Sequence, residues 1–225
     1  MSSEKAFLSG LDGEDQTIMS DTAKLDAVMT RSTVIPVLVV KDVAQARPLA
    51  EALVAGGLTT LEVTLRTPCA LEVIAEMSKV EGALVGAGTV LSPKDLEASL
   101  KAGAEFIVSP GLTESLAKSA AEHDVPFLPG VANAGDIMRG LDLGLTRFKF
   151  FPAVTNGGLP AIKAMSSVFG AVRFCPTGGI TEATAQEWLS VPSVSCVGGS
   201  WLTAGEFDAA EVTRRAKAAS ALKAS

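Results

Sequence analysis

The feature that most constrains the fold is a regular alternation of short apolar, β-rich runs with longer segments of helical periodicity. Eight such runs occupy residues 35–40, 60–65, 84–88, 106–109, 127–129, 147–151, 172–176 and 195–198. Alternation of this kind predicts parallel strands joined by helices. Eight βα units in a chain of 225 residues predict an α/β fold of the (β/α)8 TIM barrel type, with a doubly wound open sheet as the alternative.

Capping residues mark several helix boundaries in this pattern. Ser92 precedes a helix that Gly103 ends, and Asp42 and Thr113 are placed to cap two further helices. An extra N-terminal helix is expected before the first strand, over residues 20–30. We expect residues 1–19 to be a polar, disordered extension. Residues 20–225 are expected to be a single barrel domain, because no Pro/Ser-rich or highly charged linker interrupts them.

Composition argues against several classes of partner. The net charge of −6 disfavours nucleic acid and anionic membranes, which need clustered lysine and arginine. No apolar stretch reaches the roughly 18 residues of a membrane span, and the charged N-terminus lacks the apolar core of a secretory signal. The cysteines Cys69, Cys175 and Cys196 are widely spaced and suggest neither a disulfide framework nor a zinc site. We therefore expect a cytoplasmic location.

Missing residue types restrict the chemistry further. His123 is the single histidine and there is no tyrosine, so the chain cannot build a metal site from several histidines. His123 lies near the expected end of a helix, where a donor or cation stabilises the helix dipole, and we expect it to be structural. Proton transfer must then use carboxylates, lysines, cysteines or water.

Lys149 lies inside an otherwise aromatic, strand-like segment, RFKFFP at 147–152. A primary amine held away from water has a lowered pKa, so that its neutral, nucleophilic form is populated, as a Schiff-base lysine requires. Strand alternation predicts that Lys149 and Phe151 face the barrel interior, whereas Phe148 and Phe150 face the helices. The alternative is a lysine that reaches from the strand end to solvent.

The second strand also carries charged side chains. Glu62, Thr64 and Arg66 share one of its faces, and the opposite face is apolar. An inward carboxylate such as Glu62 can move protons, and the planar guanidinium of Arg66 can bind a carboxylate through two hydrogen bonds. The alternative is a structural ion pair of Glu62 with Arg66 or Lys149, which can also be the resting state of a catalytic pair.

Glycine-rich loops follow three of the expected strands. Residues 86–89, with the sequence GAGT, leave space and the hydroxyl of Thr89 at one strand end, which alone is a weak signal. Gly-Gly pairs at 178–179 and 198–199 follow the seventh and eighth strands, where barrels often bind phosphate through backbone N–H groups. We expect a phosphate site there. These glycines match no nucleotide-binding fingerprint.

Five longer motifs read EVTLRT at 62–67, VGAGTV at 85–90, SPG at 109–111, FKFFP at 148–152 and RFCPTGG at 173–179. Together they resemble the bacterial 2-keto-3-deoxy-6-phosphogluconate aldolases, in order and at family-like spacing, over about residues 25–205. The resemblance implies a class I aldolase on a (β/α)8 barrel, generally a homotrimer, which uses neither metal nor cofactor. Such enzymes cleave 2-keto-3-deoxy-6-phosphogluconate to pyruvate and glyceraldehyde 3-phosphate in the Entner–Doudoroff pathway.

The resemblance also implies roles for individual residues. Lys149 would form the Schiff base and Glu62 would be the proton shuttle. The residues implied for the pyruvyl carboxylate and the pocket wall are Arg66, Thr89, Pro110 and Phe151. The residues implied for the far hydroxyl and phosphate are Thr177, Gly178, Gly179 and Ser200.

Two other functions stay open at this point. An aldolase for the C4 epimer, 2-keto-3-deoxy-6-phosphogalactonate, shares this scaffold and lysine, and 4-hydroxy-2-oxoglutarate can be a second substrate. The other is a non-catalytic barrel that binds a phosphorylated metabolite, with Lys149 as an anion contact. The expected partner is a small phosphorylated metabolite, which for either aldolase is a phosphorylated keto acid as the main substrate.

Overall fold

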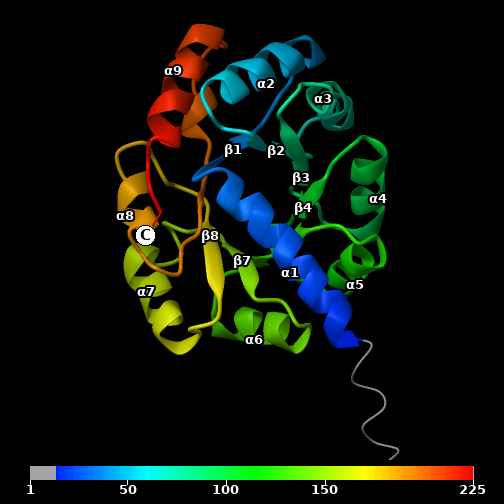
Figure 1. Ribbon diagram of the computed structural model, residues 1–225, viewed down its shortest axis with the longest axis vertical. Coiled ribbons are helices and arrows are strands. Elements are labelled where there is room, and N and C mark those ends of the chain that lie inside the picture. The colour runs from blue at the N-terminus through cyan, green and yellow to red at the C-terminus, as the bar shows by residue number, and fades with distance from the viewer. Residues whose placement is uncertain (1–13, 225) are drawn as a thin grey trace, which may run out of the picture.

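The structure is a computed structural model, which describes the backbone of residues 14–224 and the side chains of residues 22–224. Strands occupy the centre of the molecule and helices surround them, and the two kinds of element alternate along the chain (Figure 1). Every strand pairing among the described residues is parallel. The predicted α/β class with parallel strands is therefore confirmed.

The strands form two sheets. The larger has the order β5-β4-β3-β2-β1-β9 and the smaller has the order β6-β7-β8. Their bounds are β1 Val34–Leu38, β2 Thr60–Thr64, β3 Leu84–Gly88, β4 Phe106–Val108, β5 Phe127–Leu128, β6 Gly130–Val131, β7 Arg147–Phe150, β8 Arg173–Pro176 and β9 Val197–Gly199. The α-helices are α1 Glu14–Arg31, α2 Ala46–Ala55, α3 Ala70–Met77, α4 Pro93–Lys101, α5 Glu114–Glu122, α6 Ala134–Asp142, α7 Gly158–Val168, α8 Ala185–Leu189 and α9 Ala209–Ser220. Two short 3-10 helices are η1 Val43–Gln45 and η2 Trp201–Thr203.

Most observed strands match the predicted ones to within one or two residues at each end, and two of the differences have a clear physical cause. The expected strand at 127–129 ends at Leu128 as β5, and a separate strand β6 begins at Gly130, because Pro129 between them has no N–H to donate to the ladder. The eighth strand begins at Val197 rather than at residue 195. The reason is that the N–H of Ser195 donates to Phe174 in β8 (3.0 Å), and pairing with β1 begins only at Val197.

Helix caps follow the sequence closely. The side chain of Ser92 accepts a hydrogen bond from the N–H of Asp95 at the start of α4, and Thr113 caps α5 in the same way. Asp42 caps η1, which leads directly into α2. His123 is the C-cap of α5, and its Nδ1 lies 2.8 Å from the carbonyl oxygen of Ser119, so its predicted place at the end of a helix is confirmed.

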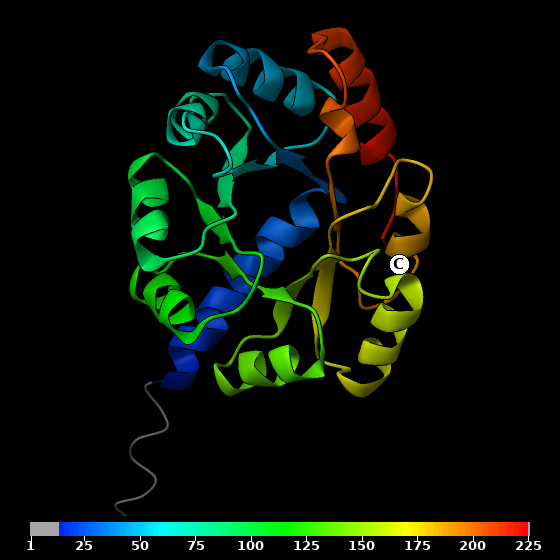
Figure 2. The same cartoon turned by 180° about the vertical axis from the view of Figure 1, so that it is seen from behind.

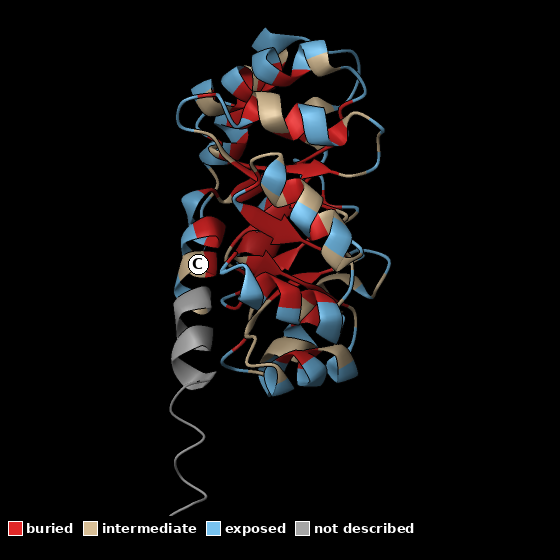
Figure 3. Cartoon of the chain, turned by 90° about the vertical axis from the view of Figure 1, so that its right-hand side faces the viewer, coloured by how far each residue is buried: buried red, intermediate tan, exposed pale blue. Residues whose placement is uncertain are grey.

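Apolar side chains pack on both faces of the strands, and the strands are almost entirely buried (Figure 3). The outer face, which includes Phe148 and Phe150, packs against the surrounding helices. The inner face forms a separate cluster with the last turns of α1. Its members are Leu25, Val28, Met29, Ile35, Phe106, Val108, Leu128, Cys175 and Cys196. Inward and outward residues thus alternate along each strand, as predicted.

Helix α1 covers one end of the strands, in front of them in Figure 1 and behind them in Figure 2. Asp26 accepts two hydrogen bonds from Arg147 at the start of β7, and Arg31 donates to Thr59 just before β2. The helix begins at Glu14, six residues before the expected position 20. Residues 1–13 of the predicted extension lie outside the described residues. Within residues 14–224 no helix combines the length and apolar character that crossing a membrane needs.

We expect Met29→Ala to destabilise the protein by about 2–5 kcal/mol, because its fully buried side chain fills the inner cluster and truncation leaves a cavity. Urea unfolding followed by circular dichroism measures the loss. The control is Met138→Ala on α6, whose side chain is 58% exposed and should change stability by less than about 0.5 kcal/mol. Equal effects of the two substitutions would show that α1 does not close the inner cluster.

Candidate active site

The most unusual contact in the structure joins two buried charges. Lys149 Nζ in β7 lies 3.0 Å from Glu62 Oε1 in β2, and the two residues are 4% and 3% exposed. Both face inward, as strand alternation predicted. A buried charge without a partner is strongly destabilising, so each group depends on the other for its place in the interior.

Glycines give this pair its space. A Cβ on Gly88 would lie 2.2 Å from Glu62 Oε1, so the carboxylate can occupy its position only beside a residue without a side chain. Gly130 is the in-register neighbour of Lys149 in β6, and a Cβ there would lie 2.1 Å from the carbonyl oxygen of Pro110. The absence of a side chain at position 130 therefore lets the Pro110 loop come close to Lys149.

Two thiols form the floor beneath the pair. Cys175 is the in-register neighbour of Lys149 on β8, and Cys196 lies in the same buried cluster. A hydrogen bond with Cys175, together with complete burial, raises the pKa of the Cys196 thiol well above its usual range. Nearby negative charge, including that of Glu62, acts in the same direction. The Cys196 thiol is thus held in its neutral form, and the two buried sulfur atoms present an apolar surface to the site.

A pocket of about 270 Å³ opens above Lys149. The predicted site residues that line it are Arg66, Thr89, Pro110, Lys149, Phe151, Thr177, Gly178, Gly179 and Ser200. Glu62 does not line the pocket, and it is joined to the site by the hydrogen bond that Lys149 Nζ donates to it. Gly198, from the second predicted Gly-Gly pair, also lines the pocket, whereas sequence reasoning missed Val37, Val39 and Ile180. Strand alternation could have found the first two, because they point inward near the end of β1.

One end of the pocket carries an unpaired cation. Arg66 is exposed and has no acidic partner among the described residues, and its Nε lies 3.3 Å from Thr89 Oγ1. Thr89 has a φ of 60°, a left-handed conformation that is rare for a non-glycine residue and that recurs at functional sites. A guanidinium and a hydroxyl held together in this way can bind a carboxylate.

The other end of the pocket offers backbone donors. Gly178 and Gly179 have φ values of 103° and 79°, and no described residue accepts a hydrogen bond from either N–H group. Ser200 adds an exposed hydroxyl from the end of β9. Thr177 lies across from Gly198, where a Cβ would be 2.2 Å from the threonine hydroxyl oxygen. Free N–H groups at a glycine pair can bind an anion such as phosphate.

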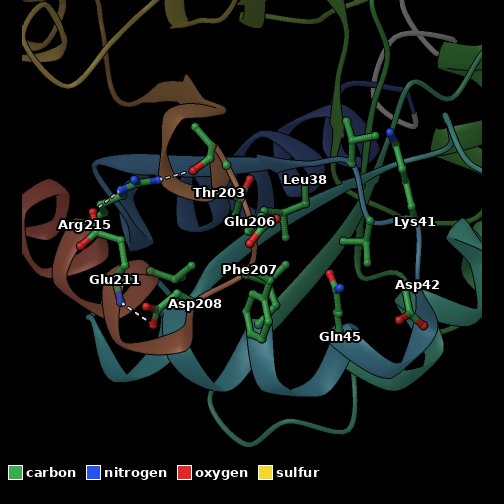
Figure 4. Close-up of a pocket in the computed structure, with 16 residues that line it drawn as sticks. Leu38, Lys41, Asp42, Gln45, Thr203, Glu206, Phe207, Asp208, Glu211 and Arg215 are labelled. Atoms are coloured by element: carbon green, nitrogen blue, oxygen red, sulfur yellow. Dashed lines mark hydrogen bonds and ion pairs between the residues drawn. The ribbon is translucent and has the colours of Figure 1, made fainter.

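A larger cavity of about 580 Å³ lies beside this pocket and shares Val39 with it (Figure 4). Its charged side chains are mostly engaged with the protein itself. Arg215 pairs with Glu211, and hydrogen bonds from Arg214 and Arg215 lower the pKa of Glu211 to about 2. Asp208 caps α9. These groups therefore stabilise α9 and its junction with η2, and we place the chemistry in the smaller pocket.

Comparison with known proteins agrees with this geometry. A family model described as KDPG and KHG aldolase matches residues 25–219. The chain belongs to this family. The 2-dehydro-3-deoxy-phosphogluconate aldolase of Zymomonas mobilis is 62% identical over 200 residues, which are 88% of this chain and 96% of the relative.

Two solved structures of the KDPG aldolase family overlap most of the chain. The Zymomonas mobilis ZM4 enzyme with 3-phosphoglycerate has a TM-score of 0.87 at 61% identity and covers 89% of this chain and 96% of its own. The Legionella pneumophila enzyme, with pyruvate captured at low pH as a covalent carbinolamine intermediate, has a TM-score of 0.85 at 44% identity, covering 88% and 98%. Among the described residues of this chain, no group of three or more His, Cys, Asp or Glu is placed to hold a metal ion.

We expect a small aromatic disulfide reagent to label one thiol in the native protein and three after unfolding in guanidinium. Cys69 is half-buried, whereas burial and a raised pKa protect Cys196, and Cys175 is buried beside it. Absorbance of the released thiolate counts the reactive groups, and Cys69→Ser should remove the native signal. Fast native labelling of two or three thiols would contradict the closed floor beneath Lys149.

Proposed function

We propose that this chain is a class I aldolase that cleaves 2-keto-3-deoxy-6-phosphogluconate to pyruvate and glyceraldehyde 3-phosphate, the aldol step of the Entner–Doudoroff pathway. The observation that carries the proposal is the 3.0 Å contact between Lys149 Nζ and Glu62 Oε1 below a pocket with anion-binding groups at both ends. The family membership and the 62% identity to the Zymomonas mobilis aldolase support it.

Imine formation begins with a proton transfer within the buried pair. Passing a proton from Lys149 to Glu62 along their hydrogen bond leaves a neutral amine and a neutral carboxyl, so no net charge leaves the site. The amine attacks the C2 ketone of the substrate to give a carbinolamine. Protonation of its hydroxyl by Glu62 releases water and leaves an iminium on Lys149 and a carboxylate on Glu62.

The iminium then draws electrons from the C3–C4 bond of the substrate. Glu62 accepts the C4 hydroxyl proton while this bond breaks, which releases glyceraldehyde 3-phosphate and leaves the enamine of pyruvate on Lys149. The proton held by Glu62 returns to C3 of the enamine. Water hydrolyses the resulting imine, which frees pyruvate and restores the lysine.

The two ends of the pocket orient the substrate. Arg66 and Thr89 hold the carboxylate next to the C2 ketone, and Pro110 and Phe151 form the walls, with Lys149 Nζ 5.5 Å from the centre of the Phe151 ring. Thr177, Gly178, Gly179 and Ser200 receive the far hydroxyl and the phosphate. We propose 4-hydroxy-2-oxoglutarate as a second substrate. It has no phosphate, and Arg66 and Thr89 hold its carboxylate in the same way.

We also propose that the two sheets close into one (β/α)8 barrel, a single domain of residues 20–225, whose extra N-terminal helix is α1 with its start moved forward to Glu14. A parallel bridge between Thr177 and Gly198 joins the sheets at one edge, and at the other only Pro129 separates β5 from β6. For the assembly we propose a homotrimer, which would have three times the 23.1 kDa mass of the chain in solution. The three free cysteines support a cytoplasmic location.

Borohydride reduction in the presence of pyruvate should trap a covalent adduct on Lys149, because only an imine is reduced to a stable secondary amine. Mass spectrometry of the digested protein should find the added mass on the Lys149 peptide alone. Adducts on exposed lysines such as Lys118 or Lys163, or no adduct, would contradict the proposed mechanism and favour a non-catalytic metabolite-binding protein.

Glu62→Gln separates imine formation from proton transfer in the same assay. The variant should still trap pyruvate on Lys149, yet its turnover with the phosphorylated substrate should fall by about 10²- to 10⁴-fold, the usual contribution of a general acid–base. Near-parental cleavage by Glu62→Gln would show that Glu62 is only a structural ion-pair partner of Lys149.

Ser200→Ala should lower kcat/KM for the phosphorylated substrate by about 10- to 150-fold, the cost of one lost hydrogen bond to a charged group. Exchange of the C3 protons of pyruvate with solvent should stay near the parental rate, because pyruvate carries no phosphate. Ser167→Ala, an exposed serine on α7, is the matched control and should change neither rate. A parallel fall of cleavage and exchange would show that Ser200 supports Lys149 rather than phosphate.

A further inference from the structure

Residues 152–156 form the turn that follows β7, the strand that carries Lys149, and precedes α7. This turn is hydrogen-bonded to the segment that contains the Gly178-Gly179 pair. The N–H of Ala153 donates to the carbonyl of Thr177 (2.8 Å), and the N–H of Val154 donates to the carbonyl of Gly178 (3.1 Å). These bonds continue the pairing of β7 with β8 beyond the ends of both strands. The glycine pair is therefore attached to the same chain segment that carries Lys149.

This attachment determines where the glycine N–H groups point. In a planar trans peptide the C=O and N–H point in opposite directions. The carbonyls of Thr177 and Gly178 point to the turn, so the N–H groups of Gly178 and Gly179, which belong to the same two peptides, point away from it. Both glycines line the pocket, so these unpaired donors are available to an anion that binds there.

Asn156 holds the turn in this position. Its backbone N–H donates to the carbonyl of Pro152 (2.9 Å) and closes the turn, and its side-chain amide Nδ2 donates to the carbonyl of Ala132 in the loop after β6. The turn is thus fastened on one side to the β6–α6 loop and on the other to the glycine pair. Asn156 is half-buried and does not line the pocket itself.

We propose that Asn156 is a positioning residue for the phosphate end of the substrate, acting through the turn 152–156 on the N–H groups of Gly178 and Gly179. The inference rests on the proposed function, since it assigns the phosphate to that end of the pocket. It separates two tasks along one segment: Lys149 reacts with the ketone, and seven residues later Asn156 sets the donors that hold the far end of the same substrate.

The test is Asn156→Ala, compared with the parent on a phosphorylated and an unphosphorylated substrate. Loss of one hydrogen bond should raise KM for 2-keto-3-deoxy-6-phosphogluconate by about 3- to 10-fold. The value of kcat/KM for 4-hydroxy-2-oxoglutarate and the exchange of pyruvate C3 protons should stay within about twofold, because neither ligand carries a phosphate. Inhibition by inorganic phosphate should weaken by the same factor as KM rises.

Two further variants make the result specific. Asn156→Asp keeps the size of the side chain but replaces the amide donor with an acceptor facing the Ala132 carbonyl, so it should raise KM at least as much as Asn156→Ala. Asn133→Ala removes the other asparagine of the chain, the N-cap of α6 in the adjacent loop, and should lower stability by about 1 kcal/mol without changing KM.

The outcomes separate this inference from the proposed function. If the parent traps pyruvate and cleaves the phosphorylated substrate while Asn156→Asp keeps the parental KM, the positioning role is wrong and the aldolase assignment stands. Equal losses on both substrates and on pyruvate exchange would also overturn it, since they would place the effect at Lys149. Should Asn156→Ala fail to fold, Asn156→Asp decides by the same readouts. A parent that traps no pyruvate would overturn the proposed function instead.

Discussion

The contact between Lys149 and Glu62 is the constraint on which the rest of the site depends. Two charges buried to this degree are tolerated only as a pair with good geometry, and the pair needs space above it and a dry surface below. Gly88 supplies the space, because any side chain there would collide with the carboxylate. The two thiols and the last turns of α1 supply the dry surface.

The two faces of the strands contribute differently to stability and to the chemistry of the site. Outward side chains such as Phe148 and Phe150 pack against the helices, and inward ones alternate with them. Below Lys149 the inward side chains belong to the apolar inner cluster, whereas above it polar, glycine and apolar residues together line the pocket. Helix α1 closes the apolar end, so one strand face contributes both to the core and to the chemistry.

Much of this arrangement follows from local rules. Period-two alternation was enough to predict that Lys149 and Glu62 point inward, and the caps at Ser92 and Thr113 mark helix starts as the structure has them. The split at Pro129 was missed, although proline cannot donate to a ladder. The motifs that resemble the aldolases pointed to both ends of the pocket, whereas Val37 and Val39, which belong to none of these motifs, were missed although strand alternation places them inward.

The sequence by itself determined the class of fold, the inward lysine and carboxylate, and the glycine-rich strand ends, because backbone periodicity and residue type act locally. Only the tertiary structure decided that Glu62 and Lys149, 87 residues apart, meet at 3.0 Å. It alone decided that Asn156 reaches the Ala132 carbonyl and that the carbonyls of Thr177 and Gly178 accept hydrogen bonds from Ala153 and Val154. Such contacts join strands from different sheets and loops between them, and their geometry depends on how the strands pack together rather than on any residue's neighbours in the chain.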